Sequence, residues 1–433
     1  MSLIDLNVGA IQEALRAGTI SEAELVQAYL AHLEKMEASL NAFITITCKE
    51  AMVRARELER LRKTGKMDAP LFGVPFSLQD NLCTAGIHTT CASKMLANFI
   101  PPYNAIVYEQ IQAAGGVLLG KNNMNEFGME NAAPALTKEP VNPWDESRAA
   151  GDGAAAAVAA KQVVFALASD TGGSLRQSAA YCGVVGLKPT YGRVSRHGLI
   201  SFASSLVQVG CLTGNVADSA TVLQVLAVPD AKDSTTGAQP VPSYQDFLTQ
   251  GVNGLRVGLP QEYLAGLDAG VKARVKQAAA TLEKLGAVVE EISLPHSGYA
   301  VLTYQLLSAG EAFSDLSNFD GVRFGLREEG KNLHDMYRKT RTAGFGAGVR
   351  RNIVLGTLIL SADFYADYFL TAQKMRTLIC QDFQQVWDQY DLVLGPVTAG
   401  IAPVRSDTRW QNEQDIYQDS RFTCAVNLAD YRL

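Results

Sequence analysis

A serine that follows an apolar run is the first residue of this sequence whose type and setting suggest chemistry. The run Val163–Ala168 is continuously apolar, which predicts a buried strand. Gly172 and Gly173 then permit a tight turn, and Ser174 comes directly before a segment, 175–182, that predicts a helix. A serine at a strand–turn–helix junction is placed like a nucleophile, and the amides of the turn can form an oxyanion hole. The alternative is that Ser174 only caps the helix.

Longer motifs around this serine resemble the amidase signature family. The segments that carry the likeness are Asp170–Arg176, Gly183–Ser195, Gly73–Phe76, Thr89–Met95, Asn142–Asp145 and Phe202–Ser205. The likeness runs from the N-terminus to about Ala429 and is closest to the amidotransferase A subunits of the family. It implies an α/β fold, with one large, mixed, mostly parallel sheet of buried strands wrapped by helices.

The resemblance also implies a set of site residues. Ser174 holds the position of the nucleophile. The turn that would form the oxyanion site contains Thr171, Gly172 and Gly173, and the pocket residues are Asp170, Arg176 and Tyr304. Tyr304 takes one of two adjacent family tyrosines, and Gln305 replaces the other. The substrate-anchoring aspartate of the family falls on Ser420, with Asp419 one residue away.

Two catalytic positions of the family carry different residues here. The family uses a buried lysine as general base and a serine that relays the proton to the nucleophile. Gln79 takes the place of the lysine, and a carboxamide has no usable basic site. The relay serine falls on Gly151, which has no hydroxyl. Asp152 is either a substitute base or a turn residue, and we favour the turn because Asp-Gly is a generic turn signal.

These changes predict a catalytically degraded member of the family. We expect a pseudoenzyme whose Ser-Ser-Lys triad is lost and which acts as a binding, scaffold or regulatory subunit. The rival prediction is an enzyme of altered amide or acyl chemistry that uses Ser174 with a non-lysine base, and a third is a receptor for a small-molecule amide. Protein partners resembling the amidotransferase B or C subunits are expected if the docking surfaces of the A subunit persist.

Composition limits the remaining classes of function. The net charge of -6 gives no basic footprint for nucleic acid. No apolar run reaches membrane-spanning length, and the first residues do not resemble a signal peptide. The seven cysteines lack paired metal-ligand spacing, which indicates free thiols in a reducing compartment. We therefore expect a cytoplasmic protein with no metal and no cofactor.

The elements that must position the serine are predicted from the apolar pattern. The pattern predicts an N-terminal helical segment at residues 1–66, packed on the core, and an α/β domain at residues 67–433. Two strand–helix–strand units are expected, one with strands 74–78 and 116–121 and one with strands 255–259 and 287–292. Residues 299–390 should be mainly helical. Because the family continues with further core strands, we expect a C-terminally shortened domain.

Overall fold

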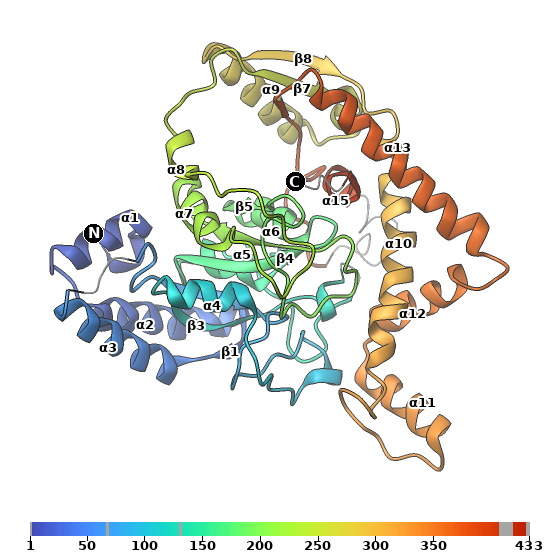
Figure 1. Ribbon diagram of the computed structural model, residues 1–433, viewed down its shortest axis with the longest axis horizontal. Coiled ribbons are helices and arrows are strands. Elements are labelled where there is room, and N and C mark those ends of the chain that lie inside the picture. Colours follow the sequence, from blue (N-terminus) through green and yellow to red (C-terminus); the bar gives the residue numbers. More distant parts are fainter. Residues whose placement is uncertain (1, 66–68, 130–131, 407–418, 430–433) are drawn as a thin grey trace.

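The computed structural model describes residues 2–65, 69–129, 132–406 and 419–429, which form two β-sheets surrounded by helices (Figure 1). The strands are β1 (Phe43–Ile46), β2 (Pro75–Gln79), β3 (Val117–Asn122), β4 (Phe165–Asp170), β5 (Val185–Leu187), β6 (Gln208–Thr213), β7 (Arg256–Pro260), β8 (Val288–Ile292) and β9 (Leu392–Val393). The helices are α1 (Val8–Arg16), α2 (Glu22–Leu40), α3 (Cys48–Lys63), α4 (Ile106–Ala113), α5 (Gly153–Ala159), α6 (Ser174–Cys182), α7 (Val216–Leu226), α8 (Tyr244–Phe247), α9 (Ala269–Lys284), α10 (Ala300–Asp315), α11 (Leu333–Gly344), α12 (Ala347–Ile359), α13 (Leu370–Trp387) and α15 (Cys424–Ala429).

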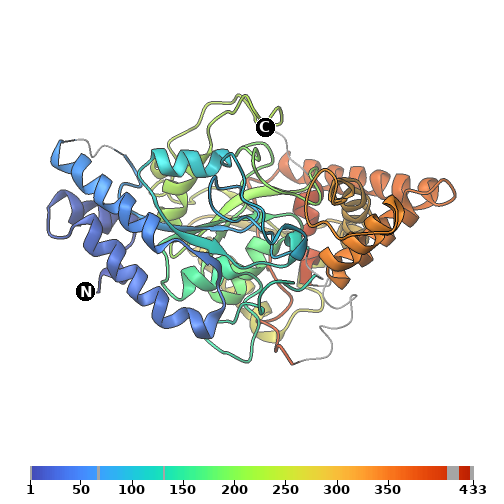
Figure 2. The same cartoon turned by 90° about the horizontal axis from the view of Figure 1, so that it is seen from below.

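The first sheet has the strand order β1-β3-β2-β4-β6-β5. Strand β2 runs parallel to both β3 and β4, and helix α4 makes the crossover between β2 and β3. All residues of β2, β3, β4 and β6 are buried, because helices cover both faces of this sheet (Figure 2). The carboxyl ends of β2, β3 and β4 therefore meet at one edge, where the candidate site lies.

The second sheet is smaller and all parallel, with the order β8-β7-β9. Helix α9 connects β7 to β8, which confirms the second predicted strand–helix–strand unit. Helices α10 to α13 form an arm that extends from the sheets, as predicted for residues 299–390 (Figure 1). A single π-helical turn at Tyr365–Phe369 leads into α13.

The predicted fold class is confirmed, with one difference in the arrangement of the strands. Four of the seven strand pairings in the described residues are parallel. The strands are divided between two sheets, whereas we expected one large sheet. Strand β9 hydrogen-bonds to β7, and β5 hydrogen-bonds to β6, so each of them ends its own sheet.

The N-terminal segment contains a strand that the sequence pattern did not reveal. Helix α2 begins at Ser21 with both halves of the expected capping box to Glu24. After α2, the β-branched run Phe43–Ile46 forms β1 at the edge of the first sheet, antiparallel to β3. The segment predicted as helical, residues 1–66, thus contains α1, α2 and α3 and, in addition, the strand β1. The division of the chain at residues 66 and 67 remains a prediction.

Two hydrophobic clusters stabilise the structure. One lies around the first sheet and includes Phe76 and Leu175, and the other lies around the helical arm and includes Tyr304 and Phe422. The turn that precedes α6 lies between the two clusters, because Leu175 belongs to the first while Tyr304 of the second packs against Gly172. In the part of the chain that the structure describes, no helix has the length and apolarity needed to cross a membrane.

Candidate active site

Ser174 lies at the start of α6, immediately after the turn that follows β4. Strand β4 ends at Asp170, Gly173 adopts φ +132°, and α6 begins at Ser174. The Ser174 hydroxyl donates a hydrogen bond to the carbonyl oxygen of Ser169 at 3.2 Å. The turn residues Thr171, Gly172 and Gly173, whose amides are the predicted oxyanion donors, directly precede the helix. The structure thus contains the strand, turn and helix that the sequence predicts around this serine.

Both glycines of the turn are packed against the helical arm and the C-terminal segment. A Cβ on Gly172 would lie 2.5 Å from Cζ of Tyr304, and a Cβ on Gly173 would lie 1.9 Å from Oγ1 of Thr423. The Thr423 hydroxyl donates to the carbonyl of Gly172 at 2.8 Å. Side chains are therefore excluded at both positions, and Tyr304 and Thr423 fix the path of the turn.

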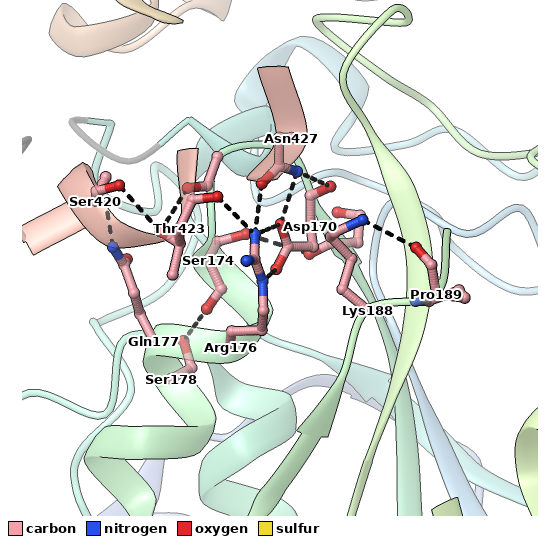
Figure 3. Close-up of polar contacts among 12 residues, drawn as sticks. Asp170, Ser174, Arg176, Gln177, Ser178, Lys188, Pro189, Ser420, Thr423 and Asn427 are labelled. Atoms are coloured by element: carbon pink, nitrogen blue, oxygen red, sulfur yellow. Dashed lines mark hydrogen bonds and ion pairs between the residues drawn. The ribbon is translucent and has the colours of Figure 1, made fainter. Parts of the chain in front are cut away.

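Asp170 and Arg176 form a buried ion pair that holds the two ends of the turn (Figure 3). Arg176 donates to both carboxylate oxygens of Asp170, at 2.9 and 3.0 Å. Asn427 of α15 completes the cluster, since its amide donates to Asp170 and its oxygen accepts from Arg176. Burial opposes ionisation of Asp170, but the charge and hydrogen bonds of Arg176 hold the pKa of Asp170 below its usual value. The local pairing of Asp170 with Arg176 that we expected is present.

A second buried network lies beside the serine, at the ends of β2 and β4. The Gln79 amide donates to Oδ2 of Asp152 at 2.5 Å, and its oxygen accepts from both the amide and the hydroxyl of Ser169. Asn81 donates to the same Ser169 hydroxyl at 2.9 Å. The carbonyl of Ser169 is in turn the acceptor for Ser174. Ser169 therefore lies between the two parts of the site: its carbonyl accepts from Ser174, while its amide and hydroxyl donate to Gln79, which contacts Asp152.

Asp152 caps a helix, and its side-chain pKa is raised. It is the N-cap of α5, and its Oδ1 accepts from the amide of Ala154 at 2.7 Å. Burial raises the pKa of Asp152 to about 6, against the hydrogen bonds from Ala154 and Gln79, which lower it. This carboxylate therefore titrates closer to neutral pH than an ordinary aspartate does, and it contacts the Gln79 amide directly.

The loop that carries Gly151 reaches α6. Gly151 has φ +82°, and a Cβ built on it would lie 2.6 Å from Oγ of Ser178. Ser178 is buried and donates to the carbonyl of Ser174 at 2.7 Å. Sequence reasoning missed Ser178, which only its spacing of one helical turn from Ser174 could have indicated.

The position expected to anchor a substrate lies against α6, beside Gln177 and Tyr181. The Ser420 hydroxyl accepts from Gln177 at 3.1 Å (Figure 3), and Asp419 accepts from the hydroxyl of Tyr181 at 2.6 Å. Both side chains are buried against the helix that begins at Ser174. The structure thus brings Ser420 and Asp419 to the same helix as the nucleophile.

Other residues of the site are absent from the sequence-based set. Thr423 and Asn427 hold the turn from a distant segment, and Ser169 links Gln79 to Ser174. The available signals were the Thr-x-x-x-Asn pattern of Thr423 and Asn427, and the place of Ser169 at the end of β4.

A cavity of about 600 Å³ adjoins this site on the side of Arg176 and Asn427. Its other walls come from residues next to β5 and β9 and from α13. Ser174 is not among the residues that line it, so we place the candidate chemistry at the serine turn and not in this cavity. Among the described residues, no group of three or more His, Cys, Asp or Glu side chains is arranged to hold a metal ion.

The fold and the serine turn define the class of protein, and comparison with known proteins gives the same class. The amidase family matches residues 24–433, and the chain belongs to this family. Two proteins named as the A subunit of glutamyl-tRNA(Gln) amidotransferase, from Geobacillus kaustophilus and Carboxydothermus hydrogenoformans, are 48% and 46% identical to it. Each match covers 99% of this chain and 90% of the relative.

Solved structures place the chain in the same group. The A subunit of the glutamyl-tRNA(Gln) amidotransferase of Thermotoga maritima has a TM-score of 0.79 at 34% identity, and the match covers 99% of this chain and 87% of that protein. A peptide amidase in complex with the inhibitor chymostatin has a TM-score of 0.82 at 28% identity, and the match covers 98% of this chain and 89% of the amidase.

These similarities correct the function that we predicted from the sequence. The substitutions at Gln79 and Gly151 led us to expect a pseudoenzyme that serves as a scaffold, and that prediction is wrong. Identity of 44–48% along almost the whole chain to proteins named as amidotransferase subunits indicates an enzyme subunit. The error came from judging each catalytic position by its own residue type, although the acid–base group of a site can be supplied by a neighbour.

Proposed function

We propose that this chain is the amide-hydrolysing A subunit of a glutamyl-tRNA(Gln) amidotransferase and that Ser174 is its nucleophile. The observation that carries the proposal is the position of Ser174 at the start of α6. It directly follows a turn whose shape is fixed by contacts with Tyr304 and Thr423. The curated relatives with this name supply the class of reaction. A small-molecule amide such as glutamine or asparagine would be the substrate.

The proposed reaction has two balanced steps. Ser174 Oγ attacks the carboxamide carbon, its proton passes through the enzyme to the leaving nitrogen, and ammonia departs from an acyl-enzyme. Water then attacks the ester, which releases the carboxylic acid and restores the Ser174 hydroxyl. The amides of Thr171, Gly172 and Gly173 are the proposed donors to the oxyanion. Asp170 and Arg176 would keep these amides in position through their ion pair.

We assign the general base to Asp152, with Gln79 as the residue that orients it. A base must ionise near the working pH, and burial raises the pKa of Asp152 to about 6. Gln79 holds the carboxylate by one end of its amide and Ser169 by the other. In this assignment Asp152 caps α5 and accepts protons, so both interpretations of this residue from the sequence apply.

The assembly and location follow from the same proposal. Partners resembling the amidotransferase B and C subunits would receive the ammonia and bind the tRNA, since this chain has a net charge of -6 and no basic footprint. A cytoplasmic location is retained as part of the proposal, because the scattered spacing of the seven cysteines indicates a reducing compartment.

The test is ammonia release from glutamine and asparagine, measured for the chain alone and with its partner subunits. Ser174→Ala should lower the rate at least about 1000-fold, because the residual rate comes from binding and oxyanion contacts alone. Ser39→Ala, at an exposed serine of α2, is the matched control and should not change the rate. Ammonia release by the Ser174→Ala variant at the rate of the unchanged chain would refute the proposal.

A further inference from the structure

Asn81 contacts the buried polar groups beside Ser174 but has no part in the reaction proposed above. Its amide nitrogen lies 2.9 Å from the hydroxyl oxygen of Ser169, and both residues are buried. The same hydroxyl oxygen lies 2.7 Å from Oε1 of Gln79, and Nε2 of Gln79 lies 2.5 Å from the Asp152 carboxylate. These four side chains therefore form a row of hydrogen bonds with Asn81 at one end and Asp152 at the other.

The direction of every hydrogen bond in this row follows from one backbone amide. The Ser169 N–H can only donate, and it lies 2.9 Å from Oε1 of Gln79, so the nitrogen of that carboxamide must face Asp152. The Ser169 hydroxyl meets the same carboxamide oxygen, which carries no proton, so the hydroxyl is the donor there. Its one proton is then used, and its contact with Asn81 requires that Asn81 donates.

The last group in the row is a carboxylate that accepts at both of its oxygens. Gln79 donates to Oδ2 of Asp152, and the backbone amide of Ala154 donates to Oδ1. Burial raises the pKa of Asp152, and these two hydrogen bonds lower it because they favour the charged form. The orientation of the Gln79 carboxamide therefore affects the pH at which Asp152 can accept a proton.

The other titratable groups around Asp152 are paired ions, a phenol and neutral thiols. From the ends of β2, β3, β4 and β6 and from α6, the described groups are the ion pairs Asp80–Lys121 and Asp170–Arg176, the Tyr181 phenol, and the thiols of Cys182 and Cys211. Burial raises the pKa of both thiols to about 12. Within this set, Asp152 is the carboxylate without a cation beside it, so neutral hydrogen bonds have a large share in setting its charge.

The backbone of Asn81 is fixed by contacts outside the row. Its carbonyl accepts from the amide of Ile200 at 2.9 Å. The residue before it, Asp80, pairs with the buried Lys121 at 3.4 Å. The position of the Asn81 amide is therefore set by the chain around it, and this amide can hold the Ser169 hydroxyl in place.

We propose that Asn81 is a positioning residue that, through Ser169, holds the Gln79 carboxamide with its N–H directed at Asp152. This inference rests on the proposed function, in which Asp152 is the general base. Without the Asn81 donor, the Ser169 hydroxyl is free to rotate away from Gln79. The carboxamide is then held less firmly, its bond to Asp152 weakens, and the carboxylate takes up a proton at a higher pH.

Titration of the Asp152 carboxyl in the full chain tests the proposal without any partner subunit. The carboxyl signals of ¹³C-labelled aspartates are followed by NMR between about pH 4 and pH 9, and the signal that disappears in Asp152→Asn is that of Asp152. Asn81→Leu removes the donor at a similar side-chain volume, and Ser169→Ala removes the hydroxyl but keeps the backbone amide. Each variant should raise the midpoint of Asp152 by about half a pH unit or more. The acid limb of ammonia release from glutamine should move in the same direction.

Asn122→Leu is the matched control. Asn122 is also a buried asparagine, it lies opposite Gln79 in the register of β2 and β3, and its amide donates to the carbonyl of Ala42 and not to Ser169. For both Asn81 and Asn122, the side-chain oxygen has no hydrogen-bond partner within the described residues. Asn122→Leu should leave the midpoint of Asp152 unchanged even if it lowers the melting temperature.

The outcomes separate this role of Asn81 from the function on which it rests. An unchanged midpoint in Asn81→Leu, or an equal shift in Asn122→Leu, would reject the positioning role. If Asn81→Leu does not fold, an unchanged midpoint in Ser169→Ala rejects it and a raised midpoint supports it. Ammonia release by Ser174→Ala at the rate of the unchanged chain would reject the proposed function, whatever the Asp152 titration shows.

Discussion

At the scale of single residues, Gln79 and Asp152 show how a neutral side chain and a carboxylate share a buried site. The Gln79 amide uses its donor on Asp152 and its acceptor on Ser169, so the polar atoms at both ends of the carboxamide are satisfied. A lysine has three donors and no acceptor, and it could not receive the two bonds from Ser169. Gln79 therefore fits the particular neighbours that this chain provides.

The first prediction concerns the effect of Asp152 on stability as the pH changes. Its pKa is about 6 in the folded chain and 3.8 in the reference state. Because the folded value is the higher one, its contribution to stability is fully present below about pH 3.8 and is lost as the pH rises through about 6. The loss amounts to about 3 kcal/mol of the free energy of unfolding.

Asp152→Asn removes this titration while Asn remains a good N-cap for α5. Relative to the unchanged chain, the variant should therefore gain about 3 kcal/mol of stability between acid and neutral pH. Urea unfolding at a series of pH values measures the difference. A constant difference at all pH values would show that Asp152 does not titrate in this window.

At the scale of elements, the turn between β4 and α6 depends on contacts from outside its own segment. Tyr304 of α10 excludes a side chain at Gly172, and Thr423 excludes one at Gly173. The ion pair of Asp170 and Arg176 ties the end of β4 to the first turn of α6. The shape of this turn therefore depends on the packing of α10 and of the segment Thr423–Ala429 against the first sheet.

The second prediction is that Gly173→Ala disrupts this turn. Gly173 has φ +132°, and the new Cβ would meet Thr423 Oγ1 at 1.9 Å, so both backbone and packing oppose the change. We expect a loss of at least about 2 kcal/mol of stability and at least about 100-fold slower release of ammonia from glutamine.

Gly18→Ala is the control for the effect of backbone conformation alone. Gly18 also has a positive φ, of +66°, but no atom lies within 4 Å of its Cβ position. Gly18→Ala should cost only the strain of the left-handed conformation, about 1–2 kcal/mol, without any change in the rate of ammonia release. Equal activity losses in the two variants would contradict the role of Thr423 as the obstacle.

At the scale of the whole molecule, one buried carboxylate joins the first sheet to the helical arm. Glu126 follows β3, is fully buried, and accepts from the hydroxyl of Ser93 and from the amide of Gly346. Gly346 is the N-cap of α12, so Glu126 satisfies an amide at a helix start, where negative charge is favourable. This contact bridges 220 residues of sequence.

The third prediction is that Glu126→Ala loosens the arm. It should lower the free energy of unfolding by about 1–3 kcal/mol, because buried donors lose their acceptor. Limited proteolysis should cut first within residues 320–346, ahead of α12. Glu34→Ala, at an exposed position of α2, should leave both stability and cleavage unchanged. Cleavage that does not respond to Glu126→Ala would show that other contacts fix the arm.

The sequence by itself determined the local framework of this protein. The apolar run, the paired glycines and the following helical segment were enough to predict β4, its turn and α6, because each depends on neighbours along the chain. The pairing of Asp170 with Arg176 was equally local. The two strand–helix–strand units were predictable for the same reason, whereas β1, an edge strand inside a helical segment, was not.

Only the tertiary structure decided which groups meet at the serine. Gln79 and Asp152 are 73 residues apart, and Thr423 lies 251 residues from the carbonyl that it bonds. Such contacts follow from the order of the strands and the packing of α5, α6 and α15, which no local pattern encodes. The hydroxyl that lies against Gly151 comes from Ser178 on a neighbouring helix. The residue type at position 151, taken alone, therefore suggested that the catalytic function was lost. A site is defined by the groups that come together in space and not by single positions in the chain.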